Sequence, residues 1–591
     1  MRLVRSLSMF VIEFHSVSAS ASESAHLHLL LADAHDARPV LADGLPEQAL
    51  GAVPSPERAP RGKDSLELDA PDRDPNDLAA QRWGVIAVQG EDGDRPLAAI
   101  RALIEHRRAQ QGPEPVIFRV PPDMDTTTAL RWKNEVLRGE SLSEDIRPRY
   151  LLILGDLDRV SVELQHVLAH GSYVGRLHCP TLAGYRAYAE KVVARERDEV
   201  AGAPRALYYT VQDGTGAVVT GHQQLVAPCI RMTREWSETG RLDLDALHEI
   251  PFSDWGPDDM LTEAGVAQPS VMLSLSHGLG APRQGWRSPE QQRALQGALS
   301  MGDAGPLTAD TVRESPFLPG GVWLPVACFA AGTPKASAFH SWLALLAERG
   351  GDLRRAQEVL RSLPGEGERP FLAALPQALL ANPLGPLAVI GHIDLAWTFG
   401  FVEATTLRSR ASRIFSTLRA LLAGSRVGVA LDALMHVYRE TNNDLLARYQ
   451  LQRDAHARGQ PDPVASRTFG NLWIQRNDLR GYVLLGDPAT HLAVRALRVP
   501  REMLDAPAQP TPAITVVTAA PDPPSPSTTS DSPMSMLDKP AEVRRRERAI
   551  LALLRGEETP RAIASRSGLE LDELFELADA YRTAGRKVLE R

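Results

Sequence analysis

Short apolar runs alternate with amphipathic stretches through the middle of the chain. From Arg82 onward, runs such as GVIAVQG, PVIFRV, RYLLILGD and ALYYTV are separated by stretches in which apolar residues recur every three or four positions. The short runs predict buried strands and the longer stretches predict amphipathic helices. Strands that alternate with helices of this length indicate βαβ units, so we expect an α/β fold with a largely parallel sheet flanked by helices.

Two of the apolar runs end in residues that carry chemistry. The run VMLSLSHGLG (271–280) contains His277 and Gly278 near its end, and GVWLPVACFAAG (321–332) contains Cys328. In an open parallel sheet, functional groups lie just beyond the carboxyl ends of strands, so an imidazole and a thiol would meet at one edge. Cys328 follows His277 by 51 residues, which leaves room for one helical crossover with extra loop. The pattern predicts a Cys-His nucleophilic pair.

The other cysteines and a second His-Gly pair lack this context. His170 follows a stretch with helical spacing, and Cys179 and Cys229 lie beside prolines. A cysteine after an apolar run is usually an inert buried thiol. Position at a strand end together with the spacing therefore singles out His277 and Cys328.

The expected chemistry is acyl transfer to a thiol. Cys328 would be the nucleophile, and His277 would transfer protons as general acid and base. Gly278 permits close approach of the backbone, so its N–H can join that of Cys328 in an oxyanion hole.

The order "apolar run, His-Gly, spacer, apolar run, Ala-Cys" resembles the caspase-type cysteine peptidases, and the gingipain branch most closely. Gingipains also carry a strand ending in Gly-Asp, then a Gly-Arg strand and an amphipathic helix. The stretches LLILGDLDRV and VGRLHCPTLAGYRAYAEKVV follow that order, and GYVLLGDP looks like the end of the catalytic domain. The resemblance covers roughly residues 82–495 and implies a caspase/gingipain-like fold with cysteine endopeptidase activity.

The resemblance also implies a basic residue at P1, the position on the N-terminal side of the cleaved bond. The family's substrate-binding aspartate corresponds to Asp156, with Asp158 as a near neighbour. A carboxylate at the end of a strand in the same sheet would face the same edge and pair with Arg or Lys. A helix N-cap explains Asp156 equally well. Trp397 is expected either to wall the substrate pocket or to pack in the core.

A third, histidine-orienting carboxylate is expected at Glu144 or Asp145, which fit a solvated loop equally well. No cofactor or metal is expected, because no two cysteines have zinc spacing.

The chain is expected to have four regions. Residues 1–81 are poorly patterned, hold one or two short strands and end in a linker, and residues 82–500 form the catalytic domain. Residues 501–540 are rich in Pro, Ser and Thr and predict a disordered tether. Residues 541–591 read as three helices, a small all-α module.

The C-terminal module is expected to dock a protein. Its third helix begins with acidic residues that would repel DNA phosphates, namely Glu570, Asp572, Glu573 and Glu576. We therefore expect an adaptor or sensor protein as its partner rather than DNA.

Composition narrows the function further. The 591 residues carry a net charge of −9 with a pI near 6.0, which argues against nucleic acid as the main partner. Three cysteines give no disulfide framework, which favours a reducing compartment, the cytoplasm. No apolar run reaches the ~18 residues of a membrane span.

The sequence thus predicts an intracellular cysteine endopeptidase that cleaves a specific partner protein. Relatives of this kind imply a bacterial defence or cell-death effector. Two alternatives stay open: a catalytically inactive caspase-like scaffold, and a DNA-binding regulator that acts through residues 541–591.

Overall fold

The computed structural model divides into two compact units, Met1–Arg501 and Glu502–Arg591. The described residues are 567 and 26–494, the latter without 47, 50–73, 141, 198–201, 253–256, 350–354, 366, 403–407 and 463–465. The predicted tether and the predicted three-helix module therefore lie outside the described residues, apart from Ser567.

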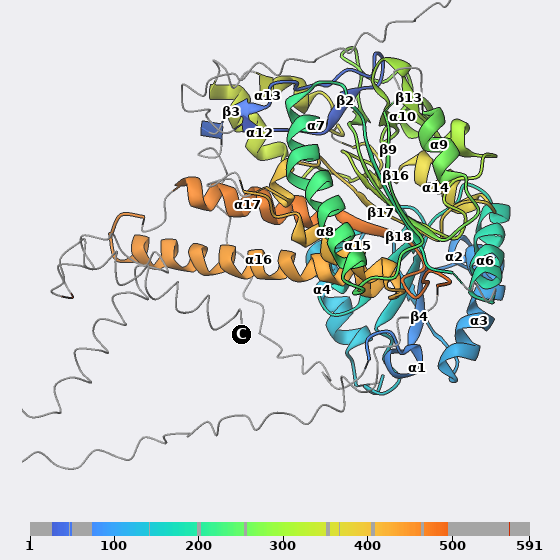
Figure 1. Ribbon diagram of the computed structural model, residues 1–591. Coiled ribbons are helices and arrows are strands. Elements are labelled where there is room, and N and C mark those ends of the chain that lie inside the picture. The colour runs from blue at the N-terminus through green and yellow to red at the C-terminus, as the bar shows by residue number, and fades with distance from the viewer. Residues whose placement is uncertain are drawn as a thin grey trace, which may run out of the picture. The chain divides into compact units, whose positions relative to one another are not determined.

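A mixed sheet of ten strands, named here in spatial order, forms the centre of the first unit (Figure 1). These strands are β5 (Val116–Val120), β4 (Trp83–Val88), β6 (Tyr150–Leu154), β7 (Tyr173–Leu177), β18 (Tyr482–Gly486), β17 (Ala388–His392), β14 (Val322–Val326), β10 (Ser270–Leu275), β8 (Arg205–Thr210) and β9 (Ala246–Ile250). All neighbours are parallel except β17 and β18. The predicted α/β class with a mostly parallel sheet is confirmed.

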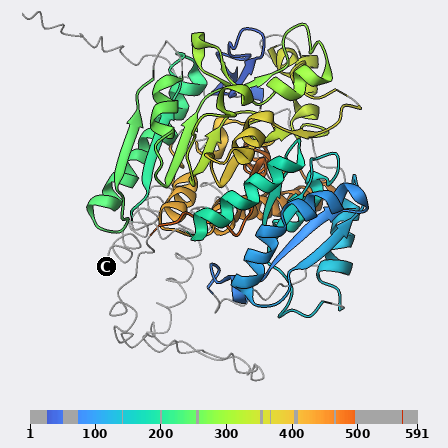
Figure 2. The ribbon, with the colours of Figure 1, turned by 90° about the vertical axis from the view of Figure 1, so that its right-hand side faces the viewer.

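The antiparallel pair divides the sheet into two halves that run in opposite directions. Ala388 of β17 lies opposite Gly486 of β18, and His392 lies opposite Tyr482. The carboxyl ends of β4 to β7 are therefore at one edge, and those of β8, β10, β14 and β17 are at the other. The blue strands of the first half and the green strands of the second lie at opposite ends of the sheet (Figure 2).

Both faces of the sheet are buried, which explains why its strands are continuous apolar runs. Successive residues of β10 enter different clusters: Leu273 packs in one and Met272 in the other. The first cluster includes side chains of α8 (Ala227–Glu238), α15 (Ser412–Leu422) and α16 (Val427–Ala457). The second includes side chains of α3 (Arg101–Gln111), α6 (Leu182–Arg197) and α14 (Ala374–Ala381).

The stretch before residue 81 contributes strands to the same unit. One or two short strands were predicted here, and the structure has three: β1 (His26–Leu27), β2 (Leu31–Asp33) and β3 (Leu45–Pro46). β1 pairs with β3, while β2 joins a second sheet with β11 (Gly278–Gly280), β12 (Leu299–Ser300) and β13 (Pro306–Leu307). Strand β11 of this second sheet begins at Gly278, one residue after His277. The second sheet therefore adjoins the predicted catalytic edge.

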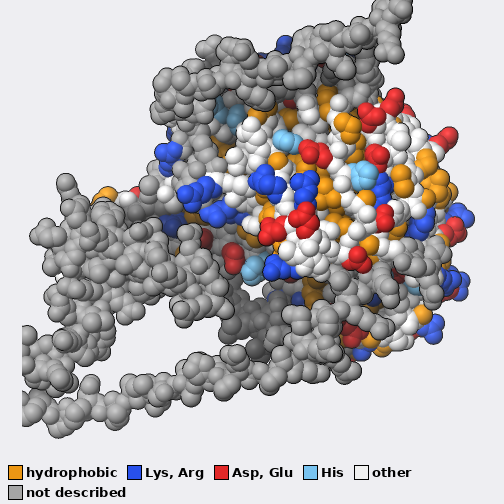
Figure 3. All heavy atoms as spheres, in the orientation of Figure 1, with side chains coloured by type: hydrophobic (Ala, Val, Ile, Leu, Met, Phe, Trp, Pro, Cys, Tyr) orange, Lys and Arg blue, Asp and Glu red, His pale blue; other side chains and the backbone are white. Residues whose placement is uncertain are grey.

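The other described elements connect and cover these sheets. They are α1 (Leu78–Gln81), α2 (Glu91–Ala99), α4 (Thr126–Trp132), α5 (Val162–Leu168), α7 (Gly216–Gly221), α9 (Asp258–Ala264), α10 (Pro289–Leu295), α11 (Ala309–Val312), α12 (His340–Arg349), α13 (Ala356–Leu360), α17 (Ser466–Arg480), β15 (Gly332–Thr333) and β16 (Phe371–Leu372). Within the described ranges, no helix combines the length and apolar character needed to cross a bilayer. On the face drawn in Figure 3, the described basic and acidic side chains are interspersed.

Candidate active site

Four neighbouring parallel strands end at the edge where the predicted pair lies. Val326 of β14 is opposite Leu275 of β10, which is in turn opposite Thr210 of β8, and β17 flanks β14 on the other side. The loops after these strands carry the residues that matter: Asp213 to Thr215, His277 and Gly278, Cys328, and Asp394 to Thr398. The prediction that the histidine and cysteine strands are adjacent and parallel is confirmed.

The His277 imidazole is buried and held through one nitrogen. Its Nε2 lies 2.9 Å from Thr215 Oγ1 and 3.1 Å from Asp213 Oδ2. The Thr215 hydroxyl donates its proton to Asp213 Oδ1 at 2.8 Å, so it accepts from Nε2–H. The other ring nitrogen, Nδ1, is buried and has no partner among the described residues. In the neutral ring this Nδ1 carries the free lone pair, which a proton-transfer residue needs.

Asp213 is suited to hold an imidazole. Burial favours its neutral form, but the hydrogen bond and charge of His277, with two hydrogen bonds from Thr215, outweigh burial and lower the pKa of the Asp213 carboxyl. A carboxylate beside the ring stabilises the imidazolium that forms during catalysis.

The Cys328 thiol is fully buried. Its Sγ accepts a hydrogen bond from the N–H of Ala396 at 3.2 Å. Burial raises the pKa of the Cys328 thiol well above its ordinary value, and the Ala396 bond offsets only part of this effect. The thiol is therefore neutral in the state described, and it must give its proton to a base before it can act as a nucleophile.

Two backbone donors converge beside the thiol. The N–H groups of Gly278 and Cys328 both donate to the carbonyl oxygen of Leu30, at 2.9 and 3.0 Å. A Cβ at position 278 would overlap the backbone carbonyl of Cys328, so this close approach requires glycine. Paired backbone N–H groups that point at one carbonyl oxygen have the geometry of an oxyanion hole.

Asp156 does not lie at this edge. The prediction that its strand end faces the same edge as His277 and Cys328 is wrong, because β6 belongs to the half that runs in the opposite direction. The Asp156 carboxylate is buried and accepts the N–H groups of Leu157 at 2.8 Å and Leu372 at 2.7 Å. It fixes the end of β6 to β16. Asp158 is half-buried on the same turn.

The predicted third members, Glu144 and Asp145, are exposed in the loop before β6. Four strands separate β6 from β10, so neither residue is close to His277. Asp213, which the sequence analysis did not single out, occupies this position instead. The signal was present, because Asp213 follows the apolar run ALYYTV just as His277 and Cys328 follow theirs.

Trp397 has two separate contacts. Its side chain is buried against the rings of Phe339 and Trp342, so it packs in the core. Its backbone forms an antiparallel bridge with Leu29 and donates to Asp478 Oδ1 at 2.7 Å. The backbone at Trp397, rather than the indole, therefore faces the N-terminal stretch.

His392 ends β17 at the same edge, but its two ring nitrogens already contact the backbone carbonyls of Asp394 and Asp478, at 2.8 and 2.9 Å. Burial lowers the pKa of both His170 and His392 to about 4. Burial raises the pKa of Cys179 and of Cys229 to about 12.

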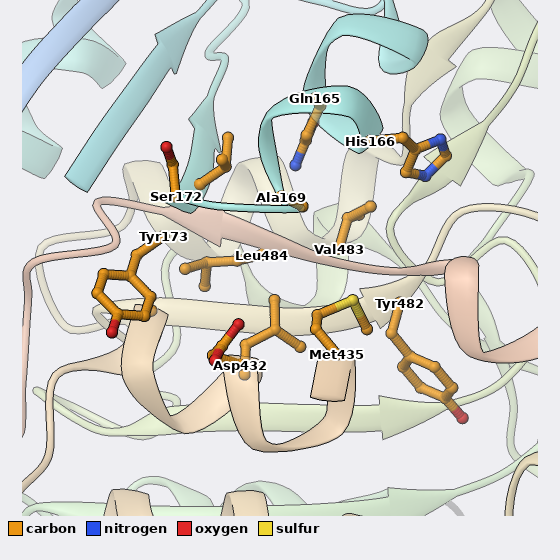
Figure 4. A pocket seen from close by; sticks show the side chains of 13 residues that line it. Gln165, His166, Ala169, Ser172, Tyr173, Asp432, Met435, Tyr482, Val483 and Leu484 are labelled. Carbon is orange, nitrogen blue, oxygen red and sulfur yellow. The ribbon is translucent and has the colours of Figure 1, made fainter. Parts of the chain in front are cut away.

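A cavity elsewhere in the unit offers no competing site. It is lined by side chains of α5, β7, α16 and β18, including His166, Asp432 and Tyr482 (Figure 4). Its volume of about 30 Å³ is close to that of a single water molecule, so it has no room for a substrate. Within the described ranges, no three His, Cys, Asp or Glu side chains are grouped to hold a metal ion.

The matches to known proteins are few and distant. No protein-family model and no curated protein matches the chain. A crystal structure of gingipain R (RgpB), an Arg-specific cysteine proteinase, is 12% identical with a TM-score of 0.37 and covers 70% of this chain and 78% of its own. A complex of the pro- and mature domains of Porphyromonas gingivalis RgpB is 11% identical with a TM-score of 0.38, covering 70% and 80%.

A third structure, named only as a protease, is 11% identical with a TM-score of 0.37. At such TM-scores the likeness carries no argument about activity, so the function is argued below from the site.

Proposed function

We propose that this chain is a cysteine endopeptidase, with Cys328 as nucleophile and His277 as general acid and base. The observation that supports this most is the convergence of the Gly278 and Cys328 N–H groups on one peptide carbonyl oxygen. The buried thiol and an imidazole held by a carboxylate come from the same two strand ends. A cysteine with a purely structural role does not require an oxyanion hole and a carboxylate-bound imidazole beside it.

The proposed reaction follows from the contacts. The Cys328 thiolate attacks the peptide carbonyl carbon, and the oxygen gains negative charge between the two N–H donors. His277 gives a proton from Nδ1 to the departing amine, while Asp213 and Thr215 hold Nε2–H. Water then hydrolyses the thioester. In enzymes with such a hole, losing one donor reduces the rate by ~10²–10³-fold.

The test is hydrolysis of an unfolded protein, such as reduced casein, by single-site variants. Cys328→Ala and His277→Ala should each abolish cleavage, and the double variant should be no worse than either, because the two groups act as a unit. Cys229→Ala and His170→Ala are matched controls that should retain activity. A folded His277→Ala variant with most of the wild-type activity would refute the assignment.

A second candidate is the inactive scaffold, which the burial of Cys328 favours. In that case the wild type and Cys328→Ala would be equally inert toward every substrate. The same variants therefore separate the two functions.

Finer parts of the hypothesis stay proposals. A cytoplasmic location is suggested by the cysteine-poor sequence. A specific partner protein and a role in bacterial defence are what the resemblance implies. Cleavage after Arg or Lys was expected from Asp156, whose carboxylate is already bonded to two backbone N–H groups, so the contacts of Asp156 do not favour it.

A further inference from the structure

The N-terminal stretch lies across the candidate active site as a peptide substrate would. The Leu30 carbonyl oxygen receives both N–H groups of the oxyanion hole. On the upstream side, Leu30 N–H donates to the Ala396 carbonyl at 3.2 Å, and Thr398 N–H donates to the His28 carbonyl at 3.3 Å. Leu29 forms an antiparallel bridge with Trp397. An extended peptide added in this way is held by its main chain, with pockets left for side chains.

The side chain at the P1 position is apolar and enclosed. Leu30 is fully buried, and it belongs to the same apolar cluster as Cys328 and Phe329. A charged side chain buried there without a partner would be strongly disfavoured. The position thus fits a leucine-like residue far better than arginine or lysine.

The chain just downstream is anchored separately. Leu31 to Asp33 form β2, which pairs in parallel with β11. The Asp33 carboxylate accepts the N–H groups of His35 at 2.7 Å and Arg283 at 2.9 Å. A break after Leu30 would leave β2 in its sheet. The described residues upstream, 26–30, would be held by β1, by the bonds to Ala396 and Thr398 and by the buried leucine side chains. Cleavage there frees these residues to leave without breaking β2.

We infer that the Leu30–Leu31 bond is a substrate of the chain's own active site, and that the site takes extended peptides with a leucine-like residue at P1. This rests on the proposed function. Cys328 Sγ forms a bond to the Leu30 carbonyl carbon, and the bond to Leu31 nitrogen breaks. The thiol proton passes through His277 to that nitrogen. Water then cleaves the thioester, which leaves a carboxylate on Leu30 and restores the thiol.

Cleavage of the Leu30–Leu31 bond also changes the reactivity of Cys328, which the N-terminal stretch covers. Burial raises the pKa of the Cys328 thiol, so the covered enzyme reacts slowly. Departure of the upstream residues exposes the cleft, and later substrates should react faster.

The first experiment follows the purified full chain by intact mass and N-terminal sequencing. A new N-terminus at Leu31 should appear at a rate independent of protein concentration, and Cys328→Ala should stay intact. Leu30→Asp should also stay intact, because its charge is excluded from the apolar position. Leu451→Asp, at a residue that is 51% exposed on α16, is the matched control and should be cleaved normally.

The second experiment uses two fluorogenic peptides, acetyl-His-Leu-Leu-aminomethylcoumarin and the same peptide with Arg at P1. The first copies residues 28–30 and should be cleaved at least ~10-fold faster by protein in which the Leu31 N-terminus has formed. Circular dichroism shows whether the uncleaved Leu30→Asp variant is folded. Peptide cleavage that needs Cys328, with the Leu30–Leu31 bond intact or with Arg preferred, would overturn this inference and leave the peptidase standing. A chain that cleaves neither peptide nor itself would overturn both.

Discussion

The Asp213, Thr215 and His277 contacts decide which nitrogen of the imidazole can act. Thr215 donates to Asp213 and therefore accepts from His277 Nε2–H, which leaves Nδ1 free. The carboxylate stabilises the positive ring that forms while the proton is in transit. Asp213 and Thr215 are thus positioning residues, since they act through His277.

We predict that Asp213→Asn lowers kcat by at least ~10²-fold while KM changes little, because only the transient imidazolium loses its partner. Thr215→Val keeps the shape and the carboxylate, so its loss should be smaller. Steady-state kinetics on a protein substrate, with circular dichroism to check folding, measures both. A normal kcat in Asp213→Asn would remove Asp213 from the mechanism.

Asp156 should matter for stability and not for specificity. Its carboxylate accepts the buried N–H groups of Leu157 and Leu372, and leaving such donors unpaired costs about 1–3 kcal/mol. Asp156→Ala removes this acceptor and should therefore lower the free energy of unfolding in urea by that amount and leave the P1 preference unchanged. Asp158→Ala is the control and should be close to wild type. A changed P1 preference in folded Asp156→Ala would restore the original prediction.

At the scale of residues, position at the end of a strand predicted the site residues correctly where the direction of the strand was also predicted correctly. It placed His277 and Cys328 on adjacent strands, and it would have found Asp213 had the rule been applied to ALYYTV. It misplaced Asp156, because an apolar run does not reveal which way its strand points.

At the scale of elements, the backbone of Ala396 to Thr398 is the segment that bonds the N-terminal stretch, through an isolated antiparallel bridge between Trp397 and Leu29. Asp478 holds this segment in place, because its Oδ1 accepts the Trp397 N–H at 2.7 Å. Burial raises the pKa of the Asp478 carboxyl to about 8, against hydrogen bonds from Trp397 and Gly400 that lower it. The folded chain therefore keeps a proton that the unfolded chain releases near 3.8.

The raised pKa of Asp478 predicts how the free energy of unfolding depends on pH. Between about 4 and about 8 the folded state binds more protons at Asp478 than the unfolded state, so its contribution to the free energy of unfolding falls as pH rises. Asp478→Asn keeps the acceptor for Trp397 and cannot titrate, so its urea midpoint should fall less over this range. A slope as steep as that of the wild type would contradict the assignment.

The role of the N-terminal stretch was not visible in the sequence. LHLLLADAH predicted short strands, and these exist. Its position in the site depends on backbone hydrogen bonds, which any residue makes, and on pairing with chain more than 240 residues away. Strands of two or three residues such as β2 and β11 are also too short for a periodic pattern.

At the scale of the whole molecule, the sequence predicted the α/β class and nearly every strand of the large sheet, but not the reversal between β17 and β18. Alternating strands and helices favour a parallel sheet. The chain between β17 and β18, by contrast, holds the three helices α15, α16 and α17, and its length does not fix the direction of return.

A buried ion network joins the helices α3 and α6 to the end of β18. Arg107 on α3 pairs with Glu196 on α6 at 2.6 Å and with Asp487, just after β18, at 2.7 Å. Arg107→Met should lower the free energy of unfolding by about 3–5 kcal/mol, because it removes the arginine charge that two buried carboxylates share. Arg101→Met, which removes an exposed pair with Glu105, should cost under about 1 kcal/mol. Equal urea midpoints for the two variants would contradict this account.

The central claim, that Cys328 is the nucleophile of a peptidase, is tested most directly by labelling. The full chain, after the Leu31 N-terminus has formed, is treated with a peptidyl chloromethyl ketone carrying His-Leu-Leu, digested and mapped by mass spectrometry. The account predicts stoichiometric modification of Cys328 and none at Cys179 or Cys229. Labelling of another cysteine, with Cys328 unmodified in protein that still cleaves its substrate, would contradict it.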